Sequence, residues 1–266
     1  MTITRITRLG GATMARPSAT PITTRATLSA IARAGGILAY LDPEQPAQSP
    51  SPLSLPDLVN RDYRLNAATT GESPAATTIG GNAAYDYDGT NDALDLVTIN
   101  GGGAVNILPA GGSYSVIMAV QPDALAATKS IMGGVSGSGV WARMDIGTNG
   151  ALAGYHGGGA GLPQTAAGKI TAGAMYICAL SFDADADTLA VYLNGEIGST
   201  VQSGPAAITT RTLQIGNHAA SGYQQFDGKI GDVIVVDWAL QAAANAVRRQ
   251  SVFAALAAKW GVTLVS

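Results

Sequence analysis

The segment YICALSFDADADTLAVYLNGE, residues 176–196, decides the fold that this sequence predicts. Two mainly apolar runs, 176–182 and 189–193, flank the acidic stretch 183–187. Branched and aromatic side chains favour strands because they pack well on a pleated surface. Asn194-Gly195 follows at once, and this dipeptide readily takes the positive φ angles of a tight hairpin turn. The segment therefore predicts two antiparallel strands joined by a polar tip, with a second tight turn directly after them.

Similar short runs recur along most of the chain between Gly, Asn and Asp turns. Their close spacing indicates an all-β sandwich or barrel rather than alternating strands and helices. Four prolines, at positions 46, 50, 52 and 56, predict an irregular surface loop over 44–56. The other predicted strands are 37–41, 83–87, 114–120, 130–132, 140–146, 212–215 and 230–236.

The two ends of the chain differ from its middle. Residues 1–36 are interpreted as an N-terminal arm, and the domain proper as 37–266. The arm carries no acid, so it is either a solvated terminus or a segment that docks on an acidic partner. Apolar residues at mostly helical spacing predict a C-terminal helix over 239–260, with Gly261 as its C-cap. The candidate attachment residues of the arm are Arg5, Arg8, Arg16, Arg25 and Arg33.

Composition bounds the class of protein. The 266 residues are 47% hydrophobic and 12% charged, which suits a full core and argues against global disorder. The single Cys178 excludes a disulfide within one chain, and with only two histidines no structural zinc site is expected. The charge-free stretch 96–122 is broken by Gly and Pro, so we expect no membrane span, and residues 1–8 show no secretory signal. Five spaced arginines do not predict a nucleic-acid-binding surface, because the rest of the chain is not basic.

Several segments, taken in order, resemble one family. Residues 85–92 read YDYDGTND, 189–195 read LAVYLNG, and 213–216 with 226–233 read LQIG and FDGKIGDV. They resemble the Phe-Asp-Gly-Ser/Thr-Asn-Asp segment, the Tyr-x-Asn-Gly turn and the closing Ile-Gly…Phe-x-Gly-x-Ile-x-Glu-Val signature of concanavalin A-like, laminin-G-type jelly rolls. The tail, 240–262, is similar to the helix that ends such domains in many phage-encoded proteins. Residues 41–43, LDP, and 58–63, LVNRDY, resemble the Leu-Asp…Trp-x-Asp opening of that subgroup, with Asn60 where tryptophan is usual.

The resemblance covers residues 37–262 and implies an antiparallel two-sheet jelly-roll sandwich with an N-terminal arm and a C-terminal helix. Its phage-type tail implies a virion structural protein of a phage or phage-like particle: a head spike, a decoration protein or a tail-associated adhesin. Such a protein would be made in the host cytoplasm, form a homo-oligomer, and bind other virion proteins through the arm. Its candidate ligand is host cell-surface polysaccharide, with no membrane or nucleic-acid partner. The alternatives are a polysaccharide-active hydrolase and a stand-alone lectin.

Glycoside hydrolysis is the enzymatic reaction to test for this fold. It needs two carboxylates about 5–9.5 Å apart. The laminarinase-type relatives carry Glu-x-Asp-x-x-Glu on one strand, and this chain has no such motif. Asp145 and Asp232 are single acids on predicted strands. We therefore expect a non-enzymatic protein and assign no catalytic residue.

Two kinds of binding site remain. Sugars are held by aromatic faces and by amide or carboxylate hydrogen bonds. No cofactor is expected except calcium, for which a run of hard oxygen ligands lies within residues 86–92, although acids there and at 183–187 are also ordinary turn formers. For Trp141 and Tyr223, packing in the core or between subunits is the alternative to sugar binding. The glycan candidates are Trp141, Tyr155, Asn217, Tyr223, Gln224 and Gln225, and the calcium candidates are Asp86, Asp88, Asn91 and Asp92.

Overall fold

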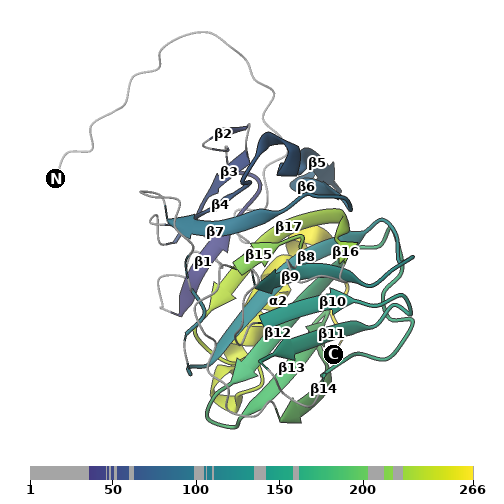
Figure 1. Ribbon diagram of the computed structural model, residues 1–266. Helices are drawn as coiled ribbons and strands as arrows, with labels where there is room; N and C mark the ends of the chain where they lie inside the picture. Colours follow the sequence, from purple (N-terminus) through teal and green to yellow (C-terminus); the bar gives the residue numbers. More distant parts are fainter. Residues whose placement is uncertain are drawn as a thin grey trace, which may run out of the picture.

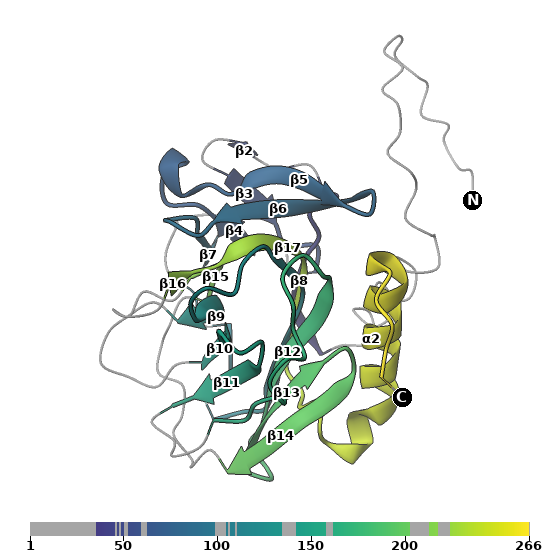
Figure 2. The same ribbon diagram turned by 90° about the vertical axis from the view of Figure 1, so that its right-hand side faces the viewer.

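Two β-sheets lie face to face, and one long helix packs on the outside of one of them (Figure 1, Figure 2). The all-β two-sheet sandwich that the sequence predicts is confirmed. Among the residues placed, no helix is both long and apolar enough to cross a membrane. The computed structural model describes residues 36–45, 47, 49–50, 53–59, 63–98, 105, 107–109, 111–134, 142–157, 162–202, 213–217 and 224–265.

Sheet A, the sheet that carries the helix, contains the segment that decides the fold. Residues 176–183 and 188–193 pair antiparallel, with Cys178 opposite Leu193. Asn194 and Gly195 have φ angles of 51° and 87°, which confirms the second tight turn. The strand order is β14 (Glu196–Gln202), β13 (Thr188–Leu193), β12 (Tyr176–Asp183), β8 (Tyr114–Pro122), β17 (Asp227–Val236), β6 (Asn82–Asp88) and β5 (Ala75–Ile79), and β1 (Ile37–Leu41) also pairs with β17.

Sheet B is built from shorter strands. All its pairs are antiparallel except that of β16 (Gln224–Gln225), which runs parallel to β9. The other strands, in order, are β11 (Leu152–His156), β10 (Ala142–Ile146), β9 (Lys129–Gly134), β15 (Leu213–Ile215), β7 (Leu94–Thr98), β4 (Tyr63–Asn66), β3 (Leu53–Pro56) and β2 (Ser49–Pro50).

The central strands of sheet A are buried on both faces. Along β12, Tyr176, Cys178 and Leu180 pack in the core between the sheets, whereas Ile177 and Ala179 pack in a second cluster under the helix. All eight residues of β12 are buried. Because successive side chains of a strand point to opposite faces, burial on both sides requires an almost unbroken apolar run. This explains the composition of residues 176–182.

The C-terminal helix is shorter than the sequence predicts. The predicted range was 239–260, but α2 spans Ala246–Trp260, after a short 3₁₀ turn at Ala243–Asn245. The chain before it is held by sheet A instead, because the backbone N–H of Leu240 donates to the Ser181 hydroxyl at 2.8 Å. The C-cap prediction is confirmed: Gly261 is left-handed with φ 66°. A second 3₁₀ turn, Thr70–Glu72, lies between β4 and β5.

The predicted irregular loop over 44–56 is also partly wrong. Leu53–Pro56 forms β3, whose Leu55 is buried and lies opposite Leu65 of β4. Pro50 lies in β2, the outermost strand of the order, and Pro56 ends β3. Proline is tolerated at edges and ends of strands because no ladder N–H is required there.

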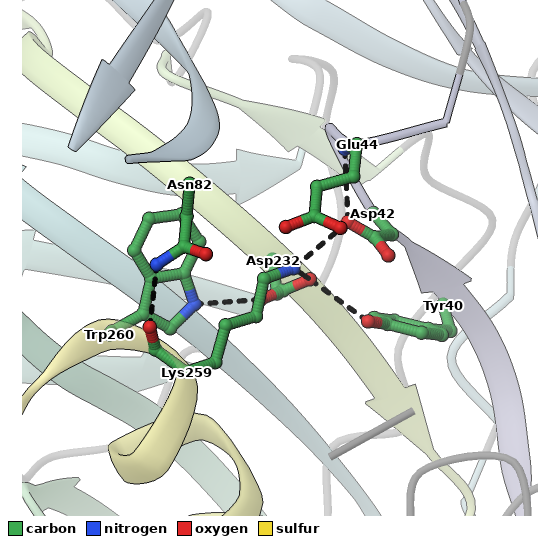
Figure 3. A network of polar contacts seen from close by, with 7 residues as sticks. All are labelled: Tyr40, Asp42, Glu44, Asn82, Asp232, Lys259 and Trp260. Carbon is green, nitrogen blue, oxygen red and sulfur yellow. Dashed lines mark hydrogen bonds and ion pairs between the residues drawn. The ribbon is translucent and has the colours of Figure 1, made fainter. Parts of the chain in front are cut away.

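A buried polar cluster fixes the end of α2 to sheet A (Figure 3). The Lys259 ammonium donates to Oδ1 of Asp42 and to Oδ1 of Asp232, both at 2.9 Å. Asp232 also accepts hydrogen bonds from the Tyr40 hydroxyl at 3.0 Å and from the Trp260 indole N–H at 2.7 Å. The cluster thus joins β1, β17 and α2, which are far apart in the sequence.

This cluster holds one cation and two carboxyl groups away from water. The side chains of Lys259 and Asp42 are 2% and 3% exposed, and that of Asp232 is fully buried. Burial raises the pKa of Asp232 to about 6 against the opposing effect of Lys259, and Asp42 adds to the rise. Burial alone would lower the pKa of Lys259, but the two aspartates raise it above its ordinary value. Removal of the lysine would leave two buried acids facing each other.

We therefore predict that Lys259→Met lowers the unfolding free energy by about 3–5 kcal/mol, the cost of breaking a buried ion pair from one side. Chemical denaturation followed by circular dichroism measures it. Lys169→Met is the matched control, because the Lys169–Glu196 pair is 47% and 44% exposed and its loss costs at most about 1 kcal/mol. Equal effects of the two substitutions would contradict this role of the cluster.

Candidate functional site

Sheet B differs from sheet A because its second face carries polar and charged side chains. On β10, Ala142, Met144 and Ile146 belong to the core between the sheets. Arg143 and Asp145 alternate with them and so point to the opposite face. We call this face, turned away from sheet A, the outer face of sheet B.

Four side chains on β9, β10 and β11 form a connected group on this outer face. Nε of Arg143 lies 2.6 Å from Oδ2 of Asp145, and the Ser130 hydroxyl donates to Oδ1 of the same carboxylate at 2.5 Å. The Arg143 guanidinium lies over the Tyr155 ring, 5.3 Å from its centroid. This contact orients the aromatic ring, since cations are attracted to aromatic faces. Tyr155 itself stays half-buried.

Asp145 is almost fully buried, although it is an acid on the outer face of a sheet. Only 5% of the residue is exposed. Burial raises its pKa to about 6, although Arg143 and the Ser130 hydroxyl act in the opposite direction. The carboxyl therefore changes charge close to neutral pH.

A row of polar residues continues from this group across the other strands. Ser54 lies opposite Asn66, Asn66 opposite Asp95, Asp95 opposite Gln214, and Gln214 opposite Gly133. Directly opposed residues of an antiparallel pair share one face. The Gln214 amide donates to the Asp95 carboxylate at 2.8 Å. We call these four side chains, Ser54, Asn66, Asp95 and Gln214, the polar row.

Three polar atoms on or beside this row are buried without a partner. Among the described residues, Oγ of Ser54, Oε1 of Gln214 and Nε of Arg64 accept or donate no hydrogen bond. Ser54 and Gln214 are 2% and 7% exposed. An unsatisfied buried polar group costs about 1–3 kcal/mol, so these three atoms are a local cost to the stability of the fold.

The structure brings two of the predicted glycan residues to this face. Tyr155 contacts Arg143, and Gln225 of β16 lies opposite Ser130, which contacts Asp145. Asn217 is half-buried two residues after β15. Trp141 and Tyr223 lie outside the described residues, as does the side chain of Gln224. All six remain predictions as sugar contacts.

Sequence reasoning missed Arg143, Ser130, Asp95, Gln214 and Ser54. A signal was present for three of them, because 94–96, 142–146 and 213–215 alternate apolar and polar residues. Alternation marks a strand with one polar face, but it does not say which strands are neighbours. The row exists only through pairings such as Asp95 with Gln214, which are 119 residues apart.

The predicted calcium residues form a hydrogen-bonded turn after β6. Oδ1 of Asp88 accepts from the backbone N–H groups of Thr90 at 2.8 Å and Asn91 at 3.3 Å. Oδ2 of Asp92 accepts from the N–H of Asp88 at 2.8 Å, and Asp86 lies 3.9 Å from Lys229. In the described ranges, no three His, Cys, Asp or Glu side chains are grouped to hold a metal ion. The contacts are those of a capped turn, and calcium binding stays a prediction.

The five arginines of the arm also lie outside the described residues. The two acids considered for hydrolysis are both placed, and they lie on different sheets. Asp145 points from the outer face of sheet B, whereas Asp232 lies between sheet A and α2. These two aspartates do not form a catalytic pair.

The raised pKa of Asp145 predicts a pH-dependent difference between wild type and Asp145→Asn. A folded-state pKa above the ordinary 3.8 stabilises the fold below pH 3.8, and this contribution is lost as the pH rises through about 6. Between pH 4 and pH 7, the unfolding free energy of the wild type should fall by up to about 3 kcal/mol relative to that of Asp145→Asn. Urea denaturation at both pH values measures it, and a constant difference would contradict the raised pKa.

Solved structures of two other proteins are similar to this chain. Domain 4 of AbnA, an extracellular GH43 arabinanase from Geobacillus stearothermophilus solved with arabinotriose, is similar with a TM-score of 0.61 and 16% identity, over 83% of this chain and 98% of that one. Trypanosoma rangeli sialidase in complex with sialic acid is similar with a TM-score of 0.59 and 15% identity, over 87% of this chain but 38% of the sialidase. At these identities the likeness shows the fold.

No curated protein matches the chain. The family model described as the concanavalin A-like lectin/glucanases superfamily matches residues 88–244, more than half of the sequence. This range runs from the turn after β6 to the 3₁₀ turn before α2, and it includes the group on β9, β10 and β11 together with Asp95 and Gln214 of the polar row. Ser54 and Asn66 precede it. The chain therefore belongs to the concanavalin A-like lectin/glucanases superfamily.

Proposed function

We propose that this protein is a non-enzymatic carbohydrate-binding jelly roll that holds its ligand on the outer face of sheet B. The observation that carries the proposal is the half-buried Tyr155 ring, oriented by Arg143, on the same face as the polar row. A saccharide offers hydroxyl groups that both donate and accept, so it pairs with half-buried groups such as the Asp95 carboxylate and the Asn66 amide.

In this proposal Tyr155 supplies the stacking surface and Gln214 supports the hydrogen bonds to the sugar. The half-buried Tyr155 ring, oriented by Arg143, offers apolar surface to a sugar ring. Gln214 donates its amide N–H to Asp95 and so fixes this half-buried carboxylate in position for the ligand. Support comes from the similar structures, since the arabinanase domain was solved with arabinotriose and the sialidase with sialic acid.

The biological setting is proposed from the sequence. The Arg-containing arm, 1–36, and the phage-type tail favour a virion structural protein of a phage or phage-like particle, made in the host cytoplasm. In this role the arm binds other virion proteins, and the jelly roll, as a homo-oligomer, presents its sugar-binding face to a host polysaccharide. Stoichiometric presence in purified virions, lost on deletion of residues 1–36, is the expected result. Its absence from virions would leave the stand-alone lectin as the better proposal.

For sugar binding, we predict that Tyr155→Ala and Gln214→Leu each weaken affinity by about tenfold or more. Loss of a stacking surface or of a buried hydrogen bond costs about 1.4 kcal/mol, and this is a factor of ten. A glycan array with neutral and acidic oligosaccharides identifies the probe, and calorimetry with the strongest hit gives the dissociation constants.

Arg248→Ala is the matched control, because Arg248 is exposed on α2, on the far side of sheet A. Its affinity should equal that of the wild type. The proposal is wrong if no oligosaccharide on the array binds, or if all three variants bind like the wild type while remaining folded.

A further inference from the structure

The cluster beneath α2 places the Lys259 ammonium in direct contact with a carboxyl group. Nζ of Lys259 lies 2.9 Å from Oδ1 of Asp42, with both side chains at most 3% exposed. A third group, Asp232, contacts the same Nζ at 2.9 Å (Figure 3). From this geometry we propose that Lys259 and Asp42 form an intramolecular amide bond that links the first strand of the domain to its last helix.

Burial favours the neutral product of this reaction over the separate charges. Two carboxyl groups and one ammonium share a site that water does not reach, and the desolvation of such ions is expensive. Amide formation replaces the ammonium of Lys259 and the carboxylate of Asp42 by one neutral group. Only Asp232 then remains ionisable, with the Tyr40 hydroxyl and the Trp260 indole N–H still donating to it.

Amide formation between Lys259 and Asp42 releases one water molecule. Although the two aspartates raise the pKa of Lys259, the step passes through its neutral amine: Asp232 accepts a proton from the ammonium and leaves a lone pair on Nζ. Nζ attacks Cγ of Asp42 and the C–N bond forms. A C–O bond of Asp42 then breaks, and the departing oxygen takes up two protons from the cluster and leaves as water. In sum, ammonium and carboxylate give amide and water, and Asp232 returns to its starting state.

Two neighbouring contacts suit these roles. The backbone N–H of Glu44 donates to Oδ1 of Asp42 at 3.0 Å, where it stabilises negative charge that develops on that oxygen during attack. Asp232 has a pKa raised to about 6 by burial, so it exchanges a proton near neutral pH. The Asn82 amide donates to the backbone carbonyl of Lys259 at 2.6 Å and fixes the lysine on the helix.

The experiment is the intact mass of the purified, full-length wild-type chain. The expected result is a species lighter than the sequence mass by one water molecule. Protease digestion should also yield one branched peptide that contains both residue 42 and residue 259. Wild-type protein of full sequence mass, with the two residues in separate peptides, overturns the proposal without any need for a variant.

Three variants assign the roles. Lys259→Arg keeps the positive charge but offers no reactive amine, so it should retain its full mass. Asp232→Asn removes the proton acceptor and should show most of the chain unlinked. In Asp42→Asn the same attack expels ammonia, so the mass should fall by one ammonia instead of one water. Water loss from this last variant would show that Asp42 is not the linked residue and would overturn the assignment.

Discussion

The structure depends on the burial of sheet A from both sides. Its central strands contribute alternate side chains to two separate apolar clusters, one facing sheet B and one facing α2. The helix can come this close because the strands present small residues to it. Ala119, Ala179 and Ala190 line the contact, and a Cβ on Gly231 would lie 2.1 Å from the Trp260 ring. Two serines within this layer are paired: Ser115 and Ser181 bond each other and the backbone before α2.

Burial of sheet A on both faces leaves the outer face of sheet B for polar chemistry. The core-facing residues of sheet B are as apolar as those of sheet A, but its alternate positions carry Arg143, Asp145, Asp95 and Gln214. The sandwich core below holds these side chains in register, strand by strand. A rigid sheet that presents polar groups at fixed spacing is preorganised for recognition, because little side-chain freedom is lost when a ligand binds.

Local patterns predicted much of the fold. The hairpin at 176–193 and the turn at Asn194-Gly195 follow from neighbours in sequence, and so does the C-cap at Gly261. The short strands 63–66, 75–79 and 196–202 carry too few apolar residues for a clear signal, and their pairing partners define them. The start of α2 was misplaced because Ser181, about 60 residues earlier, holds the backbone of Leu240 out of the helix.

Less of the candidate site could be predicted from the sequence, because the site also depends on contacts between distant segments. Alternation indicates a strand with one polar face, but the polar row needs four strands brought side by side. The unpaired oxygen of Gln214 depends on the positions of every surrounding donor. Tyr155 and Gln225 were predicted from residue type, and they do lie on the face where the polar groups gather.

The positions of both ends of the described chain give the molecule a front and a back. Gly36 lies against Trp238, and the N–H of Val265 bonds the carbonyl of Asn194, so the ends meet the fold on the helix-bearing flank of sheet A (Figure 2). A carrier that held the described domain by these two points would contact the helix-bearing flank, opposite the outer face of sheet B. Several copies tethered side by side would thus point their fronts the same way, and weak single contacts would add up to avidity.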